Sequence, residues 1–254
     1  MYFRISLLKI TISITLFVSV FLSGCGYAGS GALELPAKAS NEQIISHKAY
    51  ALVYDEETEQ AKWVAWELTN DELNGDAKRK NNFKEDPLIL TGSATDADYS
   101  KSGYDRGHLA PAADMTWSQL AMDESFYYSN MSPQHPSLNR GIWKRLETKT
   151  REWAEKYEKI YVATGPVFIN VIEEIGPNKV DVPSHYYKTF LITKDNDLQT
   201  IAFLIPNEKG DKDIFEYAVT VDSIEHITNI DFYHLLHDRY EDKVESTFDL
   251  DYWK

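Results

Sequence analysis

Two stretches of the chain carry side chains whose types and spacing suit acid–base and metal chemistry. Arg106 and His108 stand two residues apart, so an extended backbone would place both side chains on one face. A histidine titrates near neutral pH and can act as a general base, and an arginine can pair with a phosphate. Asn139 and Glu147 stand eight residues apart, which in a continuous helix separates them by about 80° around the axis and about 12 Å along it. Both offer hard oxygen atoms, so they could face one cleft with a hydrated Mg²⁺ ion between them.

The distribution of charge limits what the chain can bind. Its 254 residues include 26 Lys and Arg against 40 Asp and Glu, a net charge of −14, which argues against a protein that coats nucleic acid through its overall field. Residues 101–151 differ, because seven basic residues there oppose five acidic ones. Arg140 and Lys144 belong to this basic stretch and are candidate contacts for the phosphates of a substrate.

Three sequence blocks in order carry a resemblance to a known family. They are DRGH at 105–108, SNMSPQ at 129–134 and LNRGIWKRLE at 138–147, with a nine-residue step from Asn130 to Asn139. Together they resemble the DNA/RNA non-specific endonucleases of the ββα-metal (His-Me finger) group. Weaker similarity extends over about 47–237, nearly all of the chain that follows its N-terminal segment.

The resemblance implies a role for each candidate residue. His108 would take a proton from the attacking water, and Asn139 would be the one direct protein ligand of Mg²⁺, with Mn²⁺ as a substitute ion. Glu147 would hold water molecules of the metal. Asn130 would orient His108. Arg106 and Arg151 would stabilise the charge that develops on phosphorus, and the products would carry a 5′-phosphate and a free 3′-hydroxyl.

The N-terminus is typical of an exported lipoprotein. Arg4 and Lys9 precede a 13-residue stretch of apolar, Ser and Thr residues, which is shorter than the about 20 residues that span a bilayer. The chain has one cysteine, Cys25, and it follows Leu-Ser-Gly, a sequence that resembles a bacterial lipobox. We therefore expect a signal peptide over 1–24, a lipidated Cys25 and tether over 25–45, and attachment to the bacterial envelope, the outer membrane in particular.

Patterns of apolar residues predict one mixed domain. Strand-like runs at 49–54 and 62–68 flank a polar turn, and 188–193 and 200–205 form a second such pair. Helical spacing of apolar residues predicts one long helix over 138–157. The remaining expectations are a buried strand at 159–168 that ends in a turn at Gly165-Pro166, short helices at 118–123, 221–226 and 231–236, an endonuclease domain over 46–240 and an acidic tail over 241–254. The fold class is α+β, with a largely antiparallel sheet and flanking helices.

These observations favour a Mg²⁺-dependent endonuclease that cleaves DNA with little sequence preference. Cleavage of RNA, the oligomeric state and the biological role stay open. Two other interpretations remain: a phosphodiesterase for small or lipid-linked substrates, and a lipoprotein that binds nucleic acid without cleaving it. Asp105 is expected to support the backbone of its motif, and Asp114 to cap a turn or to orient neighbouring polar groups.

Overall fold

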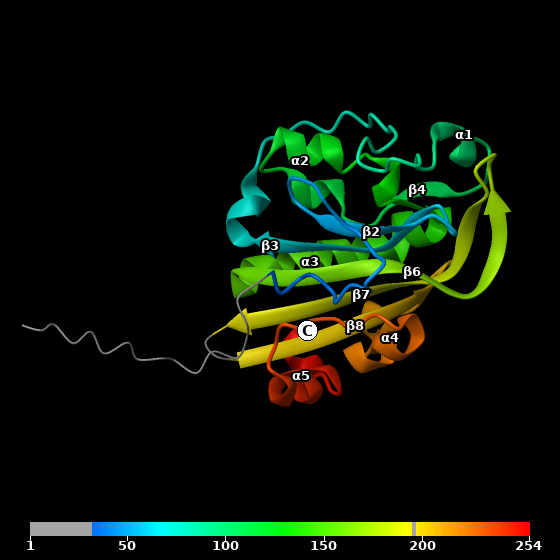
Figure 1. Cartoon of the computed structure of the whole chain (residues 1–254). Coiled ribbons are helices and arrows are strands. Elements are labelled where there is room, and N and C mark those ends of the chain that lie inside the picture. The colour runs from blue at the N-terminus through cyan, green and yellow to red at the C-terminus, as the bar shows by residue number, and fades with distance from the viewer. Residues whose placement is uncertain (1–31, 195–196) are drawn as a thin grey trace, which may run out of the picture.

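A computed structural model describes residues 32–194 and 197–254 (Figure 1). Its centre is a seven-stranded antiparallel sheet with the order β1-β2-β3-β6-β7-β8-β9. The strands are β1 (Ile44–Ser46), β2 (Ala51–Asp55), β3 (Gln60–Thr69), β6 (Lys159–Ile175), β7 (Val180–Lys194), β8 (Asp197–Pro206) and β9 (Ala218–Val219). Both expected strand pairs, β2–β3 and β7–β8, are confirmed, and so is the α+β class.

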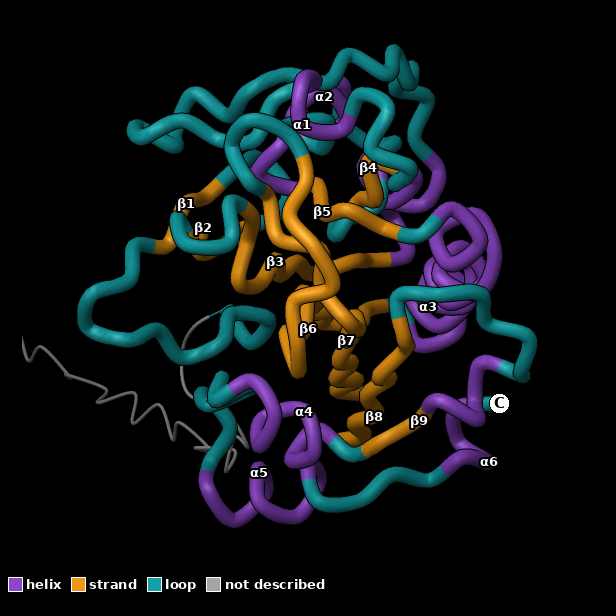
Figure 2. Tube along the Cα trace, turned by 90° about the vertical axis from the view of Figure 1, so that its right-hand side faces the viewer, coloured by secondary structure: helices purple, strands orange, loops and turns teal. Residues whose placement is uncertain are grey.

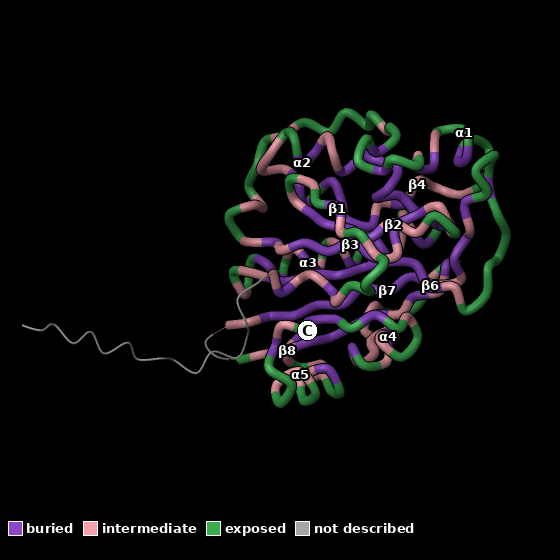
Figure 3. Tube along the Cα trace, viewed as in Figure 1, coloured by how far each residue is buried: buried purple, intermediate pink, exposed green. Residues whose placement is uncertain are grey.

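Both faces of this sheet are covered, which the alternation of side chains along β3 makes clear. Val64, Trp66 and Leu68 belong to one core cluster, whereas Trp63 and Ala65 belong to another on the opposite face. Buried residues accordingly run almost without interruption along the central strands (Figure 3). A sheet covered on both faces needs apolar residues at consecutive positions, and these five neighbouring residues meet that requirement.

Helices and a small second sheet form the two covering layers (Figure 2). The first layer contains α1 (Asp96–Tyr99), the two-stranded sheet of β4 (Asp105–His108) and β5 (Met131–Gln134), α2 (Gln119–Glu124), α3 (Lys144–Tyr157) and α6 (Leu250–Trp253). The second contains α4 (Val221–Thr228) and α5 (Asp238–Glu245). Short 3₁₀ turns lie at Asn70–Asn74, Ala112–Met115, Tyr128–Asn130 and Ile214–Tyr217.

The long helix expected over 138–157 is interrupted. Leu138–Trp143 is π-helical, Gly141 has non-helical dihedral angles (φ −107°, ψ −106°), and regular α-helix begins at Lys144. The expected 80° separation between Asn139 and Glu147 assumed unbroken helical geometry, so that prediction was wrong. Glycine accepts such a backbone conformation because it has no Cβ.

The strand expected to end at Gly165-Pro166 continues to Ile175 as β6. Its pairing with β3 ends at Thr164, whereas pairing with β7 goes on through Pro166 opposite Tyr186. Proline has no N–H to donate and is tolerated where one side of a strand is unpaired. A turn is therefore not required at this proline.

Three terminal or irregular segments also differ from expectation. Residues 231–236 were expected to be helical and are not.

The expected tether also differs, because its described part, residues 32–45, packs onto the domain. Leu33 is buried in a core cluster, and the Ala37 amide donates to the Asp231 carbonyl at 2.8 Å. The acidic segment 241–254 is not a free tail, because Trp253 is fully buried and its carbonyl accepts a hydrogen bond of 2.8 Å from the Trp153 indole. The expectation of a tail rested on the acidic composition of the segment, which gives little weight to single large apolar residues such as Trp253.

Residues 1–31 lie outside the described part, and with them the expected signal peptide and Cys25. In the part that is described, no helix combines the length and apolar character needed to cross a bilayer.

Burial of Trp253 leads to a test of the C-terminal segment. Trp253→Ala should lower the free energy of unfolding by about 3–5 kcal/mol, because it removes a large buried side chain from the core. Urea denaturation followed by tryptophan fluorescence measures the change. Asp251→Ala, an exposed position in the same short helix, is the control and should alter stability by less than about 0.5 kcal/mol. Equal midpoints for the two variants would show that the segment does not support the core.

Candidate active site

The β4–β5 ribbon carries the histidine. Its register pairs His108 with Met131 and Gly107 with Ser132. A Cβ at Gly107 would lie 2.2 Å from Oε1 of Gln134, so only glycine allows the ribbon to pack this closely.

Asn130 fixes the backbone that follows His108. Its side chain is buried, with Oδ1 accepting from the Ala110 amide at 2.9 Å and Nδ2 donating to the carbonyls of Ala110 and Ser125, both at 2.9 Å. Its own carbonyl accepts from the Leu109 amide at 3.0 Å. The structure thus brings Asn130 to the chain next to His108 rather than to the imidazole itself.

The imidazole of His108 lies among aromatic rings. Phe126 meets it edge-on at a centroid distance of 4.9 Å, and Phe83 lies at 6.0 Å. Nε2 is buried and has no hydrogen-bond partner within the described residues. Burial, with a smaller contribution from the charge of Arg79, lowers the pKa of His108 from its usual 6.5 to about 3. The ring is therefore neutral near pH 7, which is the form that accepts a proton.

Two hydrogen bonds attach the π-helical segment to the ribbon. Nδ2 of Asn139 donates to Oδ2 of Asp105 at 2.9 Å, and the Trp143 indole donates to the carbonyl of His108 at 3.4 Å. The carboxylate of Asp105 also accepts from Nε and Nη2 of Arg140 at 2.8 and 2.5 Å. Since Nδ2 of Asn139 is engaged, its Oδ1 is left as the atom of the amide that can bind a cation.

Glu147 adjoins a buried group of charges on α3, β7 and the Ala112–Met115 turn. Burial raises the pKa of Glu147, and Asp114 adds to the rise, whereas the cation of Lys188 opposes it. Lys188 is fully buried, lies 4.9 Å from the ring centre of Trp66 and 4.7 Å from that of Trp143, and donates to the Leu109 carbonyl at 3.3 Å. Burial lowers the pKa of Lys188, and the neighbouring carboxylates act in the opposite direction.

Both arginines named for charge stabilisation pair with carboxylates. Arg106 contacts Oδ1 of Asp96 at 2.5 Å and donates to the Tyr128 hydroxyl at 3.1 Å. Its guanidinium also lies 5.4 Å from the ring centre of Phe83, the ring that flanks His108. Arg151 contacts the buried Asp114 at 3.0 Å.

Three residues of this site were not among the candidates: Arg79, Asp114 and Lys188. Arg79 acts electrostatically on both His108 and Glu147. Its signal in the sequence was the basic triplet at 78–80 within a polar stretch. Asp114 and Lys188 gave weaker signals, because an isolated charged residue in a strand or turn usually lies at the surface.

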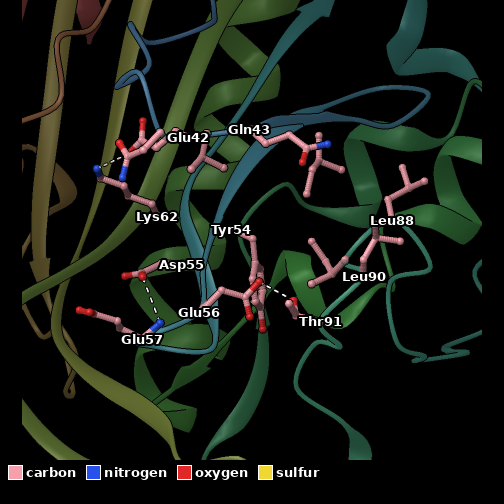
Figure 4. Close-up of a pocket in the computed structure, with 14 residues that line it drawn as sticks. Glu42, Gln43, Tyr54, Asp55, Glu56, Glu57, Lys62, Leu88, Leu90 and Thr91 are labelled. Atoms are coloured by element: carbon pink, nitrogen blue, oxygen red, sulfur yellow. Dashed lines mark hydrogen bonds and ion pairs between the residues drawn. The ribbon is translucent and has the colours of Figure 1, made fainter.

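A groove with a net positive lining lies along α3, beside Arg140. Its cavity of about 680 Å³ is lined by five basic residues, Arg140, Lys144, Arg145, Lys149 and Lys212, and by three acidic ones, Glu152, Asp211 and Asp213. Arg140 and Lys144 were the two residues expected to contact substrate, and both line it. A second cavity, of about 590 Å³, lies by β1 and β2 and is lined by Glu42, Asp55, Glu56 and Glu57 with one lysine, Lys62, paired to Glu42 (Figure 4). A polyanion would be repelled from that second cavity.

A histidine on a β-ribbon, packed against a helix that carries an asparagine and a glutamate, defines the class of ββα-metal nucleases. The sequence profile of the family described as "DNA/RNA non-specific endonuclease" matches residues 29–239. The chain belongs to this family, whose members are metal-dependent nucleases, and it is an endonuclease that hydrolyses nucleic acid.

Similarity to individual proteins agrees with this assignment. The chain is 38% identical over 205 residues to the mitochondrial endonuclease G of Homo sapiens, covering 75% of this chain and 69% of that protein. It is 35% identical over 207 residues to nuclease C1 of Cunninghamella echinulata var. echinulata, covering 75% and 82%. A chain in the crystal structure of the EndoG/EndoGI complex superposes with a TM-score of 0.74 at 32% identity, over 81% of this chain and 89% of that one.

The buried Lys188 gives a prediction for the pH dependence of activity. Its cation opposes the rise of the Glu147 pKa, so Lys188→Met should raise that pKa further, and the carboxylate would then ionise only at higher pH. The acidic limb of the kcat/KM profile should move up by about one pH unit, with about a tenfold loss of activity on that limb.

Lys194→Met, at the far end of the same strand, is the matched control and should leave the profile unchanged. Superimposable profiles for Lys188→Met and the wild type would contradict an electrostatic link between Lys188 and Glu147.

Proposed function

We propose that this protein is a Mg²⁺-dependent endonuclease that hydrolyses phosphodiester bonds of DNA, and of RNA, with little sequence preference. The observation that carries the proposal is the packing of the segment with Asn139 against the ribbon with a neutral His108. Two hydrogen bonds hold them together, one from Asn139 to Asp105 and one from the Trp143 indole to the His108 carbonyl. Family membership supplies the reaction class. The assignment of individual roles rests on the chemistry of the side chains.

The donors present suit Mg²⁺. Oδ1 of Asn139 and the carboxylate of Glu147 are hard oxygen atoms, and neither accepts a hydrogen bond within residues 32–194 and 197–254. Mg²⁺ favours few protein ligands and keeps several waters, so Asn139 would bind the ion directly and Glu147 would accept hydrogen bonds from its waters. When bound, the ion would polarise the phosphoryl oxygen and stabilise its negative charge.

The remaining residues supply proton transfer and charge stabilisation. The neutral imidazole of His108 takes a proton from the attacking water. Arg106 is positioned by Asp96, whose side chain is 77% exposed. An ion pair this exposed is weak, so a phosphate can replace Asp96 as the partner of Arg106. Arg79 and Arg151 add positive charge close to the same place, and the hydrolysis leaves a 5′-phosphate and a 3′-hydroxyl.

Low sequence preference follows from the kind of contact that the groove offers. Lysine and arginine side chains along α3 bind phosphates, which carry no base information. The overall charge of −14 repels nucleic acid elsewhere on the molecule, so binding is confined to this groove and weakens as salt is added.

We also propose that the protein is attached to the bacterial envelope, at the outer membrane, through a lipidated Cys25. Support comes from the sequence: a basic and then apolar N-terminus, and one cysteine placed directly after Leu-Ser-Gly. Several acyl chains on one cysteine suffice for stable anchoring. The nuclease domain would then face water from a membrane surface.

Removal of the general base tests the nuclease proposal. His108→Ala should lower kcat/KM on supercoiled plasmid and on structured RNA by about 10²–10⁴-fold. The control is His226→Ala, an exposed position on α4, which should keep wild-type activity. EDTA should abolish cleavage by the wild type, and Mg²⁺ should restore it, with a much weaker response in Asn139→Ala. Metal-independent cleavage, or full activity of His108→Ala, would overturn the proposal.

Lipidation has its own test. Cys25→Ser should move the protein from the membrane fraction to the soluble fraction of a bacterial host and should prevent incorporation of radiolabelled palmitate. Ser23→Ala is the control, because a small residue at that position keeps the lipobox pattern. The anchor would be excluded if Cys25→Ser stayed in the membrane fraction and the wild type incorporated no label.

A further inference from the structure

Helices α4 and α5 lie on the face of the sheet opposite the nuclease site (Figures 1 and 2). Three carboxylates of these helices lie close together. Asp222 and Glu225 are three residues apart on α4 and so lie on one side of that helix. Glu245 is the last residue of α5. One carboxylate oxygen from each of the three lies within 4.8 Å of the others.

Glu245 is the unusual member of this cluster. It is 3% exposed, and its Oε1 is buried without a hydrogen-bond partner in the described part of the chain. Burying a carboxylate without a partner costs several kcal/mol. The backbone beside it is held to β8, because the Val244 carbonyl accepts a hydrogen bond from the Thr200 hydroxyl. The side chain stays buried, and one of its oxygens lies within 4.8 Å of an oxygen of each of the other two carboxylates.

No lysine or arginine of residues 32–194 and 197–254 forms an ion pair with any of the three carboxylates. Oε1 of Glu225 accepts a hydrogen bond of 2.7 Å from the Phe232 amide, which leaves its second oxygen available to bind a cation. Burial and the charges of Glu225, Glu241, Asp222 and Asp231 raise the pKa of Glu245 to about 10. Without a cation Glu245 is therefore protonated near pH 7, and a divalent cation bound by the cluster would displace this proton.

We propose that Asp222, Glu225 and Glu245 form a Ca²⁺ site that joins α4 to α5 and is separate from the site at Asn139. The three donors are all hard oxygen atoms, and Ca²⁺ binds six to eight such ligands at about 2.3–2.6 Å, including both oxygens of one carboxylate and water. Ca²⁺ accepts irregular arrangements of such oxygen atoms, whereas Mg²⁺ requires near-ideal octahedral geometry at about 2.0–2.1 Å and usually keeps several waters. The ion would link two short helices that otherwise hold to the sheet by apolar packing and by the hydrogen bond between Thr200 and Val244.

Calcium-dependent stability of the full-length protein tests this site. After removal of metals with a chelator, addition of CaCl₂ at a hundredfold excess over its Kd should raise the Tm by about 5–10 °C. Glu245→Gln should lose most of this rise while its metal-free Tm stays close to that of the wild type, because glutamine resembles the protonated, neutral form of Glu245. Calorimetric titration with CaCl₂ should likewise lose one binding event in Glu245→Gln.

Two matched variants separate this site from other binding. Glu155→Gln changes an exposed carboxylate of another helix and should keep the full Ca²⁺ response. Asn139→Ala should also keep it, since that residue belongs to the nuclease site. Plasmid cleavage with Mg²⁺ by Glu245→Gln should match the wild type. The proposal is overturned if CaCl₂ does not change the Tm of the wild type, if Glu245→Gln responds fully, or if only Asn139→Ala loses the response.

Discussion

The buried ammonium of Lys188 is the point at which the parts of the nuclease site meet. It comes from the interior strand β7, lies 4.9 and 4.7 Å from the ring centres of Trp66 and Trp143, and donates to the Leu109 carbonyl directly after the histidine. Its charge also acts on Glu147. A desolvated cation is stabilised by ring faces, a carbonyl and a carboxylate together. Its partners come from four elements that therefore pack around it: β3, the π-helical segment, the end of the ribbon and α3.

Charge is divided across the molecule in a way that suits a polyanionic substrate. The groove along α3 is basic, while the cavity by β1 and β2 and the cluster on α4 and α5 are acidic. Within the site the cations are themselves held by carboxylates, Arg106 by Asp96 and Arg151 by Asp114. Such pairs keep the guanidinium groups in position, and the exposed pair can exchange its carboxylate for a phosphate.

The π-helical segment at Leu138–Trp143 attaches the candidate metal ligand and a buried indole to the ribbon from one short stretch. Its irregular backbone lets Asn139 reach Asp105 while Trp143 reaches the carbonyl of His108. Wider turns of this kind are frequent at functional sites. The non-helical dihedral angles of Gly141 fall inside this segment, and the regular helix that carries Glu147 begins after it, at Lys144.

The sequence by itself predicted the candidate site residues and determined the main strands. His108, Asn130, Asn139 and Glu147 became candidates because three sequence blocks resemble the motifs of a nuclease family, and the two strand pairs could be predicted because apolar runs and polar turns are local signals. Tertiary structure alone decided how these residues meet. The break at Gly141, the roles of Arg79, Asp114 and Lys188, and the anchoring of the C-terminal segment by Trp253 all depend on contacts between residues far apart in the chain. Burial and electrostatic coupling are properties of such contacts, and no local pattern of residue types specifies them.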